Sequence, residues 1–397
     1  MEKLLQNASE VCKKDAGFLF IETKFHILSK EYEKALVSLE NAIQMDPQPE
    51  FYKLAIQLDR LSGRPTNRKY LETLIDLCPT DGVIHMELGK ILNHPDDFEQ
   101  AKLLFEISID LLPRQTLPIL LLVKHLIKGA KSQEDGTIYY APDFETSKNL
   151  LQKAHQINPN EIETNYLLGE IFYLQKDYNP SKKNFKLCIK KNFKLGSSHY
   201  RLAKIYFAED DIEEAIFHLK TSTEFKEHKI DAMIELSDLY VSKSNFSLAK
   251  KHCENSLVLT RESIEDLSQY ALTLVDQSKF FEARELYQKI EKRKKDLSKL
   301  YFLLYVSLNK AENSSKNSIK LEESIAIDPS NSQASFELSK IYLAQGDKKK
   351  ARSLMKTALI NQWDNPDYHT EYGKLEISLG NMEKGLSHLA IAKSFLN

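Results

Sequence analysis

The residues best suited to chemistry in this chain are its cysteines, histidines and clustered carboxylates, with one short glycine-lysine-serine run. The run "IKGAKS" at 127–132 has Gly-x-Lys-Ser but lacks the preceding glycine and the strand of a phosphate-binding loop. The histidines show neither HxxxH nor HExxH spacing, and none is paired with a cysteine at metal-ligand spacing. We therefore predict no catalytic residue, no metal site and no cofactor.

Carboxylate pairs are abundant, as in "AEDDIEEA" at 208–215. These acids fall in a polar break and at the start of the helical pattern that follows. Side-chain oxygens there can accept hydrogen bonds from the first backbone N–H groups, and negative charge complements the helix dipole. We interpret them as helix caps and not as an acid and base pair.

Charge and hydropathy limit the partners and the compartment. The 397 residues carry 55 basic and 57 acidic side chains, so no global field would hold nucleic acid or an anionic membrane. The longest apolar run, "LPILLLV" at 117–123, is too short to span a bilayer, and the N-terminus lacks a signal-peptide pattern. Cys12, Cys78, Cys188 and Cys253 have no CxxC spacing, which favours free thiols. We expect a soluble, cytoplasmic protein.

Small residues recur along the chain with a fixed step. One series is Gly169, Ala203, Ser237, Ala271, Ser339 and Gly373, with a miss at Tyr305. A second series is Ser181, Ala215, Ala249, Ala283, Ala351 and Gly385, with a miss at Asn317. Each step is 34 residues or a multiple of it, and the interval from Pro79 to Pro113 is also 34. A period of this length is typical of repeat proteins.

Each period reads as a pair of helices. The apolar spacing is helical, and a polar break separates two segments that a short connection would make antiparallel neighbours. Ala203 and Ala215 fall where the two helices cross, because a large side chain there would push the axes beyond the usual separation of about 8–10 Å. Tyr206 fills the gap beside them.

The residues around the small positions form recurring motifs. One unit has Leu168, Gly169, Phe172 and Phe185, and another has Leu88, Gly89, Ala101, Phe105 and Pro113. With the period, these motifs resemble the tetratricopeptide repeat (TPR), although the early Trp of the family pattern is absent. The resemblance implies an all-α fold, a right-handed α-solenoid of stacked helical hairpins known as a TPR superhelix.

Counting by phase gives eleven units. They span 16–47, 48–81, 82–115, 116–161, 162–195, 196–229, 230–263, 264–297, 298–331, 332–365 and 366–397. We expect residues 1–15 to cap the N-terminal end of the stack, the units in 16–161 to be irregular, and those in 162–397 to keep the period. The last unit has no polar helix behind it, so its apolar residues are expected to be exposed, or covered by a second copy in a homo-oligomer or by further chain.

The spacing from Pro113 to Pro159 exceeds one unit by twelve residues, and the excess falls at 129–144. A connection of this length forms its own loop structure. Its adjacent aromatics, Tyr139 and Tyr140, either fold back on the neighbouring helices or contact a partner, because two adjacent rings are costly to leave in water.

The TPR resemblance also implies which residues line a binding groove. The second, fifth, ninth and twelfth positions of each first helix would point into the concave face of the superhelix. The groove residues that we predict are Tyr166, Glu170, Tyr173, Tyr200, Arg201, Lys204, Phe207, Ile234, Asp238, Phe336 and Lys340. The aromatic and apolar members could anchor a peptide or only pack the helices, and Arg201 could bind a carboxylate.

The leading hypothesis is a noncatalytic scaffold or adaptor that binds a protein or peptide in this groove. The alternative is the regulatory or substrate-recruiting arm of an enzyme whose catalytic part is a separate chain or lies outside this sequence. The Lys and Asn set with which some TPR domains grip chaperone tails is absent, because Glu235 and Asp238 stand where it would need Asn and cations. RNA binding would need basic groove positions in every unit, and the mixed charges do not supply them.

The unit 298–331 fails at both small positions, with Tyr305 and Asn317. Poor packing between its two helices would make it the weakest unit and a hinge. We expect amide hydrogen exchange to be faster at 298–320 than in either adjacent unit, and equal protection across all three units would contradict the prediction.

Overall fold

The structure, a computed structural model, describes residues 15–64, 66–92, 95–131, 138–276, 280–312 and 315–395. The expected N-terminal cap at 1–15 therefore lies outside the described residues, except for Asp15. The chain divides into two compact parts, Met1–Phe193 and Lys194–Asn397, which we call the N-terminal part and the C-terminal part. The boundary between irregular and regular repeats, placed at 161/162 by the sequence, stays a prediction.

The N-terminal part consists of paired helices. They are α2 (Ala16–Leu28), α3 (Tyr32–Met45), α4 (Pro49–Leu61), α5 (Arg68–Leu77), α6 (Gly82–Ile91), α7 (Phe98–Leu111), α8 (Leu117–Lys128), α9 (Phe144–Ile157), α10 (Ile162–Leu174) and α11 (Tyr178–Lys190). The short 3-10 helix η2 (Pro95–Asp97) precedes α7, and the antiparallel strands β1 (Ala130–Lys131) and β2 (Ile138–Tyr140) lie between α8 and α9.

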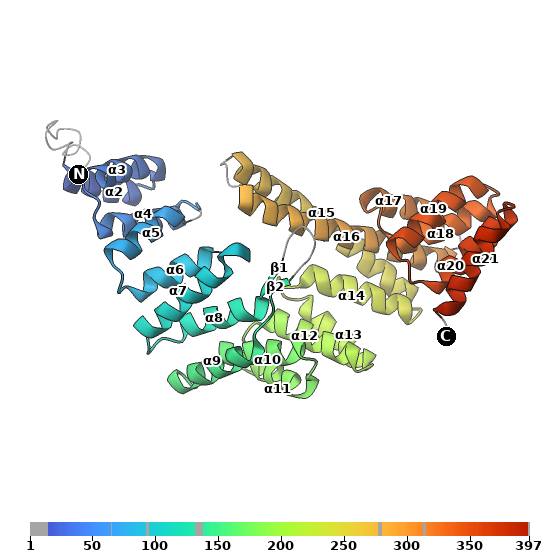
Figure 1. Ribbon diagram of the computed structural model, residues 1–397, viewed down its shortest axis with the longest axis horizontal. Coiled ribbons are helices and arrows are strands. Elements are labelled where there is room, and N and C mark those ends of the chain that lie inside the picture. The colour runs from blue at the N-terminus through green and yellow to red at the C-terminus, as the bar shows by residue number, and fades with distance from the viewer. Residues whose placement is uncertain are drawn as a thin grey trace. The chain divides into compact units, whose positions relative to one another are not determined.

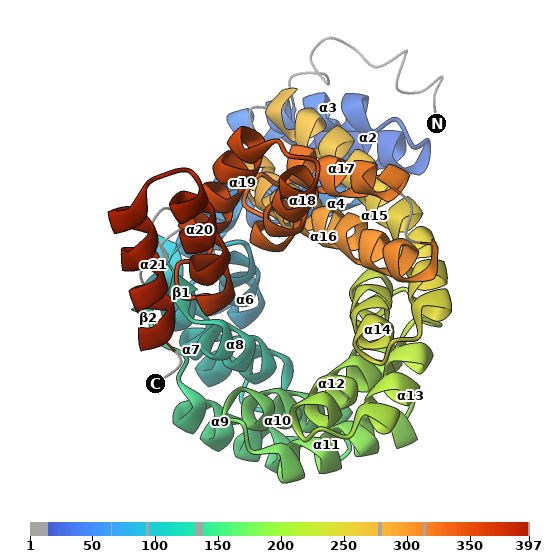
Figure 2. The same ribbon diagram turned by 90° about the vertical axis from the view of Figure 1, so that its right-hand side faces the viewer.

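The C-terminal part continues the same pattern. Its helices are α12 (Leu195–Ala208), α13 (Ile212–Ser222), α14 (Lys229–Ser242), α15 (Phe246–Asp276), α16 (Phe280–Glu312), α17 (Ile319–Ile327), α18 (Ser332–Ala344), α19 (Lys348–Asn361), α20 (Pro366–Ser378) and α21 (Met382–Ser394), with η3 (Ser315–Ser318) before α17. Figures 1 and 2 show α20 and α21 side by side, as in the other hairpins. The all-α prediction of stacked helical hairpins is confirmed.

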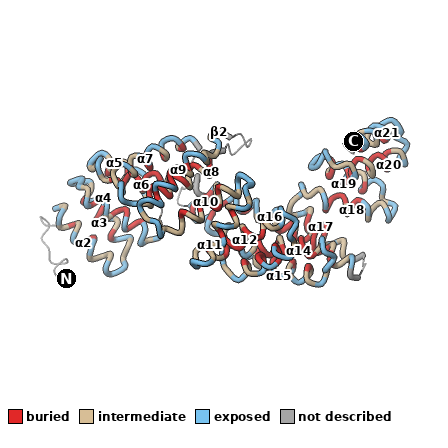
Figure 3. The backbone as a smooth tube through the Cα atoms, turned by 90° about the horizontal axis from the view of Figure 1, so that it is seen from below, coloured by how far each residue is buried: buried red, intermediate tan, exposed pale blue. Residues whose placement is uncertain are grey.

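Each helix has a buried side and an exposed side, and the alternation is visible along the tube in Figure 3. The buried sides contain the small residues of the 34-residue series. Ala203 and Ala215 are 1% and 0% exposed and share a core cluster with Leu219 and Leu236. In α10–α11, Ser181 Oγ donates to the Gly169 carbonyl at 2.9 Å, and a Cβ on Gly169 would meet Phe185 at 3.0 Å. Small residues therefore permit the close helix crossing.

Local signals set the helix ends. The side chain of Asp211 accepts a hydrogen bond from the Glu214 backbone N–H at 3.3 Å, so the capping interpretation of "AEDDIEEA" is confirmed for α13. Two hairpins are also closed by a buried serine hydroxyl of the second helix that bonds the start of the first helix. Ser108 donates to the Gly82 carbonyl, and Ser222 donates to the Gly196 carbonyl. In α16–α17, Ser324 of the second helix donates to the Ser298 carbonyl in the middle of the first helix, and Ser298 donates to the Ser324 carbonyl in return.

The structure differs from the predicted repeat boundaries at 246–312. Helices α15 and α16 run without a break through 263/264 and 297/298, and Figure 1 shows them side by side and continuing past α14. No Gly or Pro stands at either boundary to force a helix end, although α12, α13 and α14 do end within the same Gly- and Pro-free stretch between Gly196 and Pro329. Their far ends, 264–276 and 280–290, which we call the arm, have their own core of Ala271, Leu274, Ala283, Leu286 and Ile290.

The arm changes which helices pack together. Ile234 of α14 contacts the second half of α16 in a cluster with Leu297, Leu300 and Tyr301. The predicted unit 230–263 is therefore packed directly against the predicted unit 298–331. The miss at Tyr305 is accommodated in the core, where this side chain is 6% exposed and packs with Leu321, but Asn317 Nδ2 is buried without a hydrogen-bond partner.

We predict that Ala215→Leu lowers the free energy of unfolding by about 1–3 kcal/mol, because the added side chain overpacks a closed helix crossing. Urea denaturation followed by circular dichroism measures the change. The matched control is Ala208→Leu at the exposed end of α12, which should leave stability nearly unchanged. Equal effects of the two substitutions would contradict close packing at Ala215.

Candidate partner-binding surface

The candidate surface is formed by the first helices of the hairpins in the C-terminal part, beginning with α12 and α14. Tyr200 of α12 stacks on His228, with ring centroids 4.7 Å apart and planes within 2°. His228 holds a left-handed backbone conformation, φ 56°, just before α14 begins. The stacked pair thus fixes the chain where α14 starts, and Tyr200 is half-buried rather than fully available to a partner.

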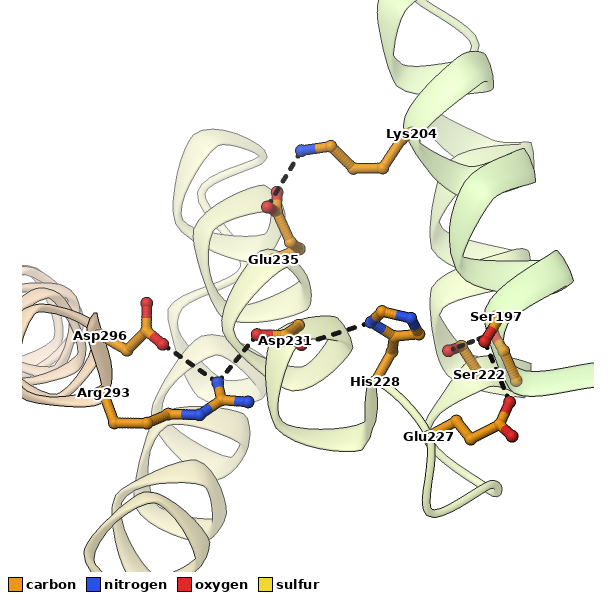
Figure 4. A network of polar contacts seen from close by, with 10 residues as sticks. Ser197, Lys204, Ser222, Glu227, His228, Asp231, Glu235, Arg293 and Asp296 are labelled. Atoms are coloured by element: carbon orange, nitrogen blue, oxygen red, sulfur yellow. Dashed lines mark hydrogen bonds and ion pairs between the residues drawn. The ribbon is translucent and has the colours of Figure 1, made fainter. Parts of the chain in front are cut away.

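Ion pairs join these first helices to one another. Lys204 of α12 pairs with Glu235 of α14 at 3.0 Å, as Figure 4 shows. Asp238, one turn further along α14, pairs with Lys299 of α16 at 2.6 Å. Both pairs are partly exposed, so each contributes little to stability but sets the pattern of charge that a partner would meet.

A second polar network lies at the start of α14 (Figure 4). Arg293 of α16 donates to Asp231 at 2.8 Å and to Asp296 at 3.1 Å, and His228 Nδ1 lies 3.4 Å from Asp231. Burial acts to raise the pKa of Asp231, but hydrogen bonds from His228 and Arg293 outweigh it and lower the pKa to about 2. The sequence did not predict this contact, because Asp231 and Arg293 are 62 residues apart and only the arm explains their proximity.

Among the predicted groove residues, Phe207 is 48% exposed on α12 and remains suited to contact a partner. Arg201, on the same helix, is half-buried. Lys340 of α18 pairs with Glu337 at 2.8 Å, and its ammonium lies 4.3 Å from the Phe336 ring centroid. Tyr166, Glu170 and Tyr173 are half-buried on α10, in the N-terminal part.

Two predicted groove residues belong to the core instead. Ile234 is 5% exposed because the second half of α16 covers it, and Phe336 is 7% exposed because it packs on Tyr368 of α20, with ring centroids 4.4 Å apart. The next hairpin covers these positions, so neither side chain can anchor a peptide without opening the stack.

The insertion at 129–144 is described only in part, since residues 132–137 and the side chain of Tyr139 lie outside the described residues. Tyr140 folds back on the preceding hairpin and stacks on Phe98, with centroids 4.5 Å apart. Phe98 in turn stacks on His125 at 4.1 Å. For Tyr140 the structure therefore favours the packing interpretation over direct partner contact.

Two further properties of the described part of the chain bear on chemistry. No group of three or more His, Cys, Asp or Glu residues in it is arranged to hold a metal ion. No helix in the same residues is long and apolar enough to cross a membrane.

The geometry defines a class of protein built from stacked antiparallel helical hairpins. Family models described as tetratricopeptide repeat match residues 196–229 and 320–375. These matches fall on α12–α13 and on the helices from α17 into α20, where the 34-residue phase is regular. Residues 196–229 and 320–375 are therefore tetratricopeptide repeats, and repeats of this family act as scaffolds for protein interaction.

Two curated proteins are similar to parts of the chain. Cell division cycle protein 27 homolog A of Arabidopsis thaliana is 36% identical over 88 residues, which is 21% of this chain and 12% of that protein. The BBSome complex member BBS4 homolog of Drosophila melanogaster is 22% identical over 271 residues, 65% of this chain and 56% of that protein. The chain therefore covers a small part of the length of the Arabidopsis protein and little more than half of the length of the Drosophila protein.

Solved structures include TPR proteins of low overall similarity. YrrB, described as a TPR protein with an unusual peptide-binding site, is 13% identical with a TM-score of 0.38, over 58% of this chain and 95% of that chain. Yeast Tom70 is 14% identical with a TM-score of 0.35, over 96% of this chain and 95% of that chain.

We predict that Arg293→Met lowers the free energy of unfolding by about 1.5–3 kcal/mol at pH 7, because it removes charge-assisted bonds to two half-buried carboxylates. The contribution of Asp231 is fully present at this pH, since a lowered carboxyl pKa adds stability above the unfolded value of about 3.9 and loses it as the pH falls toward 2. Urea denaturation at pH 7 measures the effect.

The control is Lys294→Met on the same helix, where an exposed pair with Glu291 at 2.7 Å is lost. It should cost about 0.5 kcal/mol or less. If both substitutions cost the same, the Asp231 network does not hold α14 against α16.

Proposed function

We propose that this chain is a noncatalytic scaffold or adaptor that binds a protein partner on the first helices of its C-terminal part. The observation that carries the proposal is Phe207, an aromatic side chain 48% exposed on α12. It is three residues from Lys204, whose pair with Glu235 brings α14 to the same surface. Protein interfaces favour aromatic side chains at their centre and polar or charged groups at the rim around them.

The partner that fits this surface is a peptide segment with an apolar anchor and charges of both signs. Lys204 and Lys299 are each matched by a carboxylate of the neighbouring helix, so the surface carries alternating charge and no uniform field. Alternating charge fixes the register and orientation of a bound peptide more than it raises the affinity for that peptide. The Drosophila relative is named as a member of a complex, which agrees with a role inside a multi-protein assembly.

The proposed compartment is the cytoplasm.

Self-association through the last hairpin also stays a prediction. Leu386 of α21 is 54% exposed, whereas Leu389 and Ile391 are half-buried.

The test compares two substitutions of the same kind in one hairpin. Phe207→Ala removes the exposed ring of α12, and Phe217→Ala removes a ring that is 57% exposed on α13. We expect crosslinking affinity purification from native cells to lose its main partner with Phe207→Ala and keep it with Phe217→Ala. Loss of an interface aromatic should weaken binding by at least about tenfold, which titration calorimetry with the recovered partner measures.

Both variants should keep the circular dichroism of the parent, because the two rings are surface groups. Retention of the partner by Phe207→Ala, or its loss only with Phe217→Ala, would place the binding surface elsewhere and overturn this assignment.

A further inference from the structure

Two hairpins of the C-terminal part contain the same pair of histidines. His199 of α12 and His218 of α13 face each other with Nδ1 atoms 2.8 Å apart, and His369 of α20 and His388 of α21 do so at 2.9 Å. The members of each pair are 19 residues apart, and the two pairs are 170 residues apart, which is five periods of 34. His199, His218 and His369 are buried, and His388 is half-buried.

A bond between two Nδ1 atoms requires one nitrogen to carry a proton and the other to offer a lone pair. The tautomers of the second pair follow from its surroundings. His369 Nε2 lies 2.7 Å from the Trp363 carbonyl, which only accepts, so Nε2 carries the proton. Neutral His369 then has a free lone pair on Nδ1, and His388 must donate its Nδ1–H to it.

The charges around the second pair come from three helices. Lys384 of α21 and Glu376 of α20 act on His388 in opposite directions, and Glu376 is held by Arg352 of α19 at 2.8 Å and by Lys384 at 3.1 Å. Tyr372 contacts the His388 ring edge-on at 4.9 Å. Burial lowers the pKa of His388, and His369 and Lys384 lower it further, which favours the neutral form of the His388 ring.

The first pair has a similar setting. Burial lowers the pKa of His199, and Glu224, just beyond α13, opposes that change. Glu214 lies 4.0 Å from His218 Nε2, and Tyr206 of α12 stacks on the His218 ring at 5.4 Å. His252, one period after His218, stacks on Tyr240 but has a buried Nδ1 without a hydrogen-bond partner, and Met233 stands where its second histidine would be.

We propose that the two histidine pairs are acid-sensitive latches that hold the hairpins α12–α13 and α20–α21 closed at neutral pH and release them below about pH 6. One added proton can be placed on His388 Nε2 while the Nδ1 bond remains. A second proton from solvent would have to occupy the lone pair of His369 Nδ1, and two N–H groups would then oppose each other. The bond breaks at that step, and deprotonation restores it.

The direction of the effect follows from proton linkage. The unfolded chain binds two protons per pair below its ordinary histidine pKa of about 6.5, whereas the closed hairpin accepts at most one. Stability is therefore fully present above pH 6.5 and decreases as the pH falls. An excess of one proton in the open state shifts the opening equilibrium tenfold per pH unit, or about thirtyfold from pH 6.5 to 5.0.

The only tryptophan of the chain reports on one latch. Trp363 contacts His369 edge-on at 4.7 Å and His388 at 6.1 Å. Urea denaturation of the full chain, followed by Trp363 fluorescence at pH 7.5, 6.5 and 5.0, should show the thirtyfold shift in the parent. The double variant His369→Phe/His388→Leu should lose this pH dependence, and the matched variant His199→Phe/His218→Leu should retain it.

A pH dependence that is unchanged by His369→Phe/His388→Leu would overturn the proposal. If that variant does not fold, nitrogen-15 NMR of labelled histidine in the parent decides the question. We expect the Nδ1 atoms of His369 and His388 to share one proton at pH 7.5, and a second Nδ1 proton to appear only as the hairpin opens at low pH. Independent titration of all four paired imidazoles near pH 6.5, with the fold intact, would exclude the latches.

Discussion

The close approach of the two helices in each hairpin is the constraint on which the rest of the structure depends. At the crossing of α10 and α11, a serine hydroxyl bonds directly to a glycine carbonyl of the opposite helix, and a methyl group on that glycine would press on Phe185. Large side chains are excluded from the crossing and are displaced to the sides of the hairpin, where the next hairpin packs on them. Tyr200 and Lys204 flank the small residue Ala203 on α12, and they contact His228 and Glu235 of the next hairpin.

The hairpins could be predicted from the sequence because the crossing favours a small residue every 34 positions, a series broken only at Tyr305 and Asn317. The arm could not be predicted in the same way. Ala271 and Ala283 keep the series, and they do form a close crossing, at 0% and 1% exposure. The series reports only how the two helices of a pair meet, and not whether that pair stacks on its neighbours. The usable signal was the lack of Gly and Pro between Gly196 and Pro329, which allows helices to run through predicted boundaries.

Only part of the candidate surface could be predicted, because the repeat phase gives the position of a residue on its helix but not whether the next hairpin covers it. The repeat phase placed Lys204, Phe207 and Asp238 on first helices, and the structure finds them at least partly exposed. The same phase gave Ile234 and Phe336 as surface residues, yet α16 and Tyr368 bury them. Burial at these positions depends on the size and angle of the following hairpin, which are set by residues far along the chain. The histidine pairs could not be predicted for the same reason. Their spacing of 19 residues matches no metal or catalytic motif, and only the pairing of the two helices brings the rings into contact.

The unbroken helices α15 and α16 also bear on how this chain can change in evolution. In a regular repeat array one 34-residue unit can be duplicated or deleted, because each boundary falls in a loop and the new neighbours still match. Here the boundaries at 263/264 and 297/298 fall inside helices, and Arg293 and Lys299 in the second half of α16 bond directly to α14. If the cuts stay in phase with the repeat, the smallest segment that could be gained or lost here without dividing a helix is therefore 230–331, three periods together. We expect this region of the array to change as one block, whereas the hairpins on either side of it can change in number one at a time.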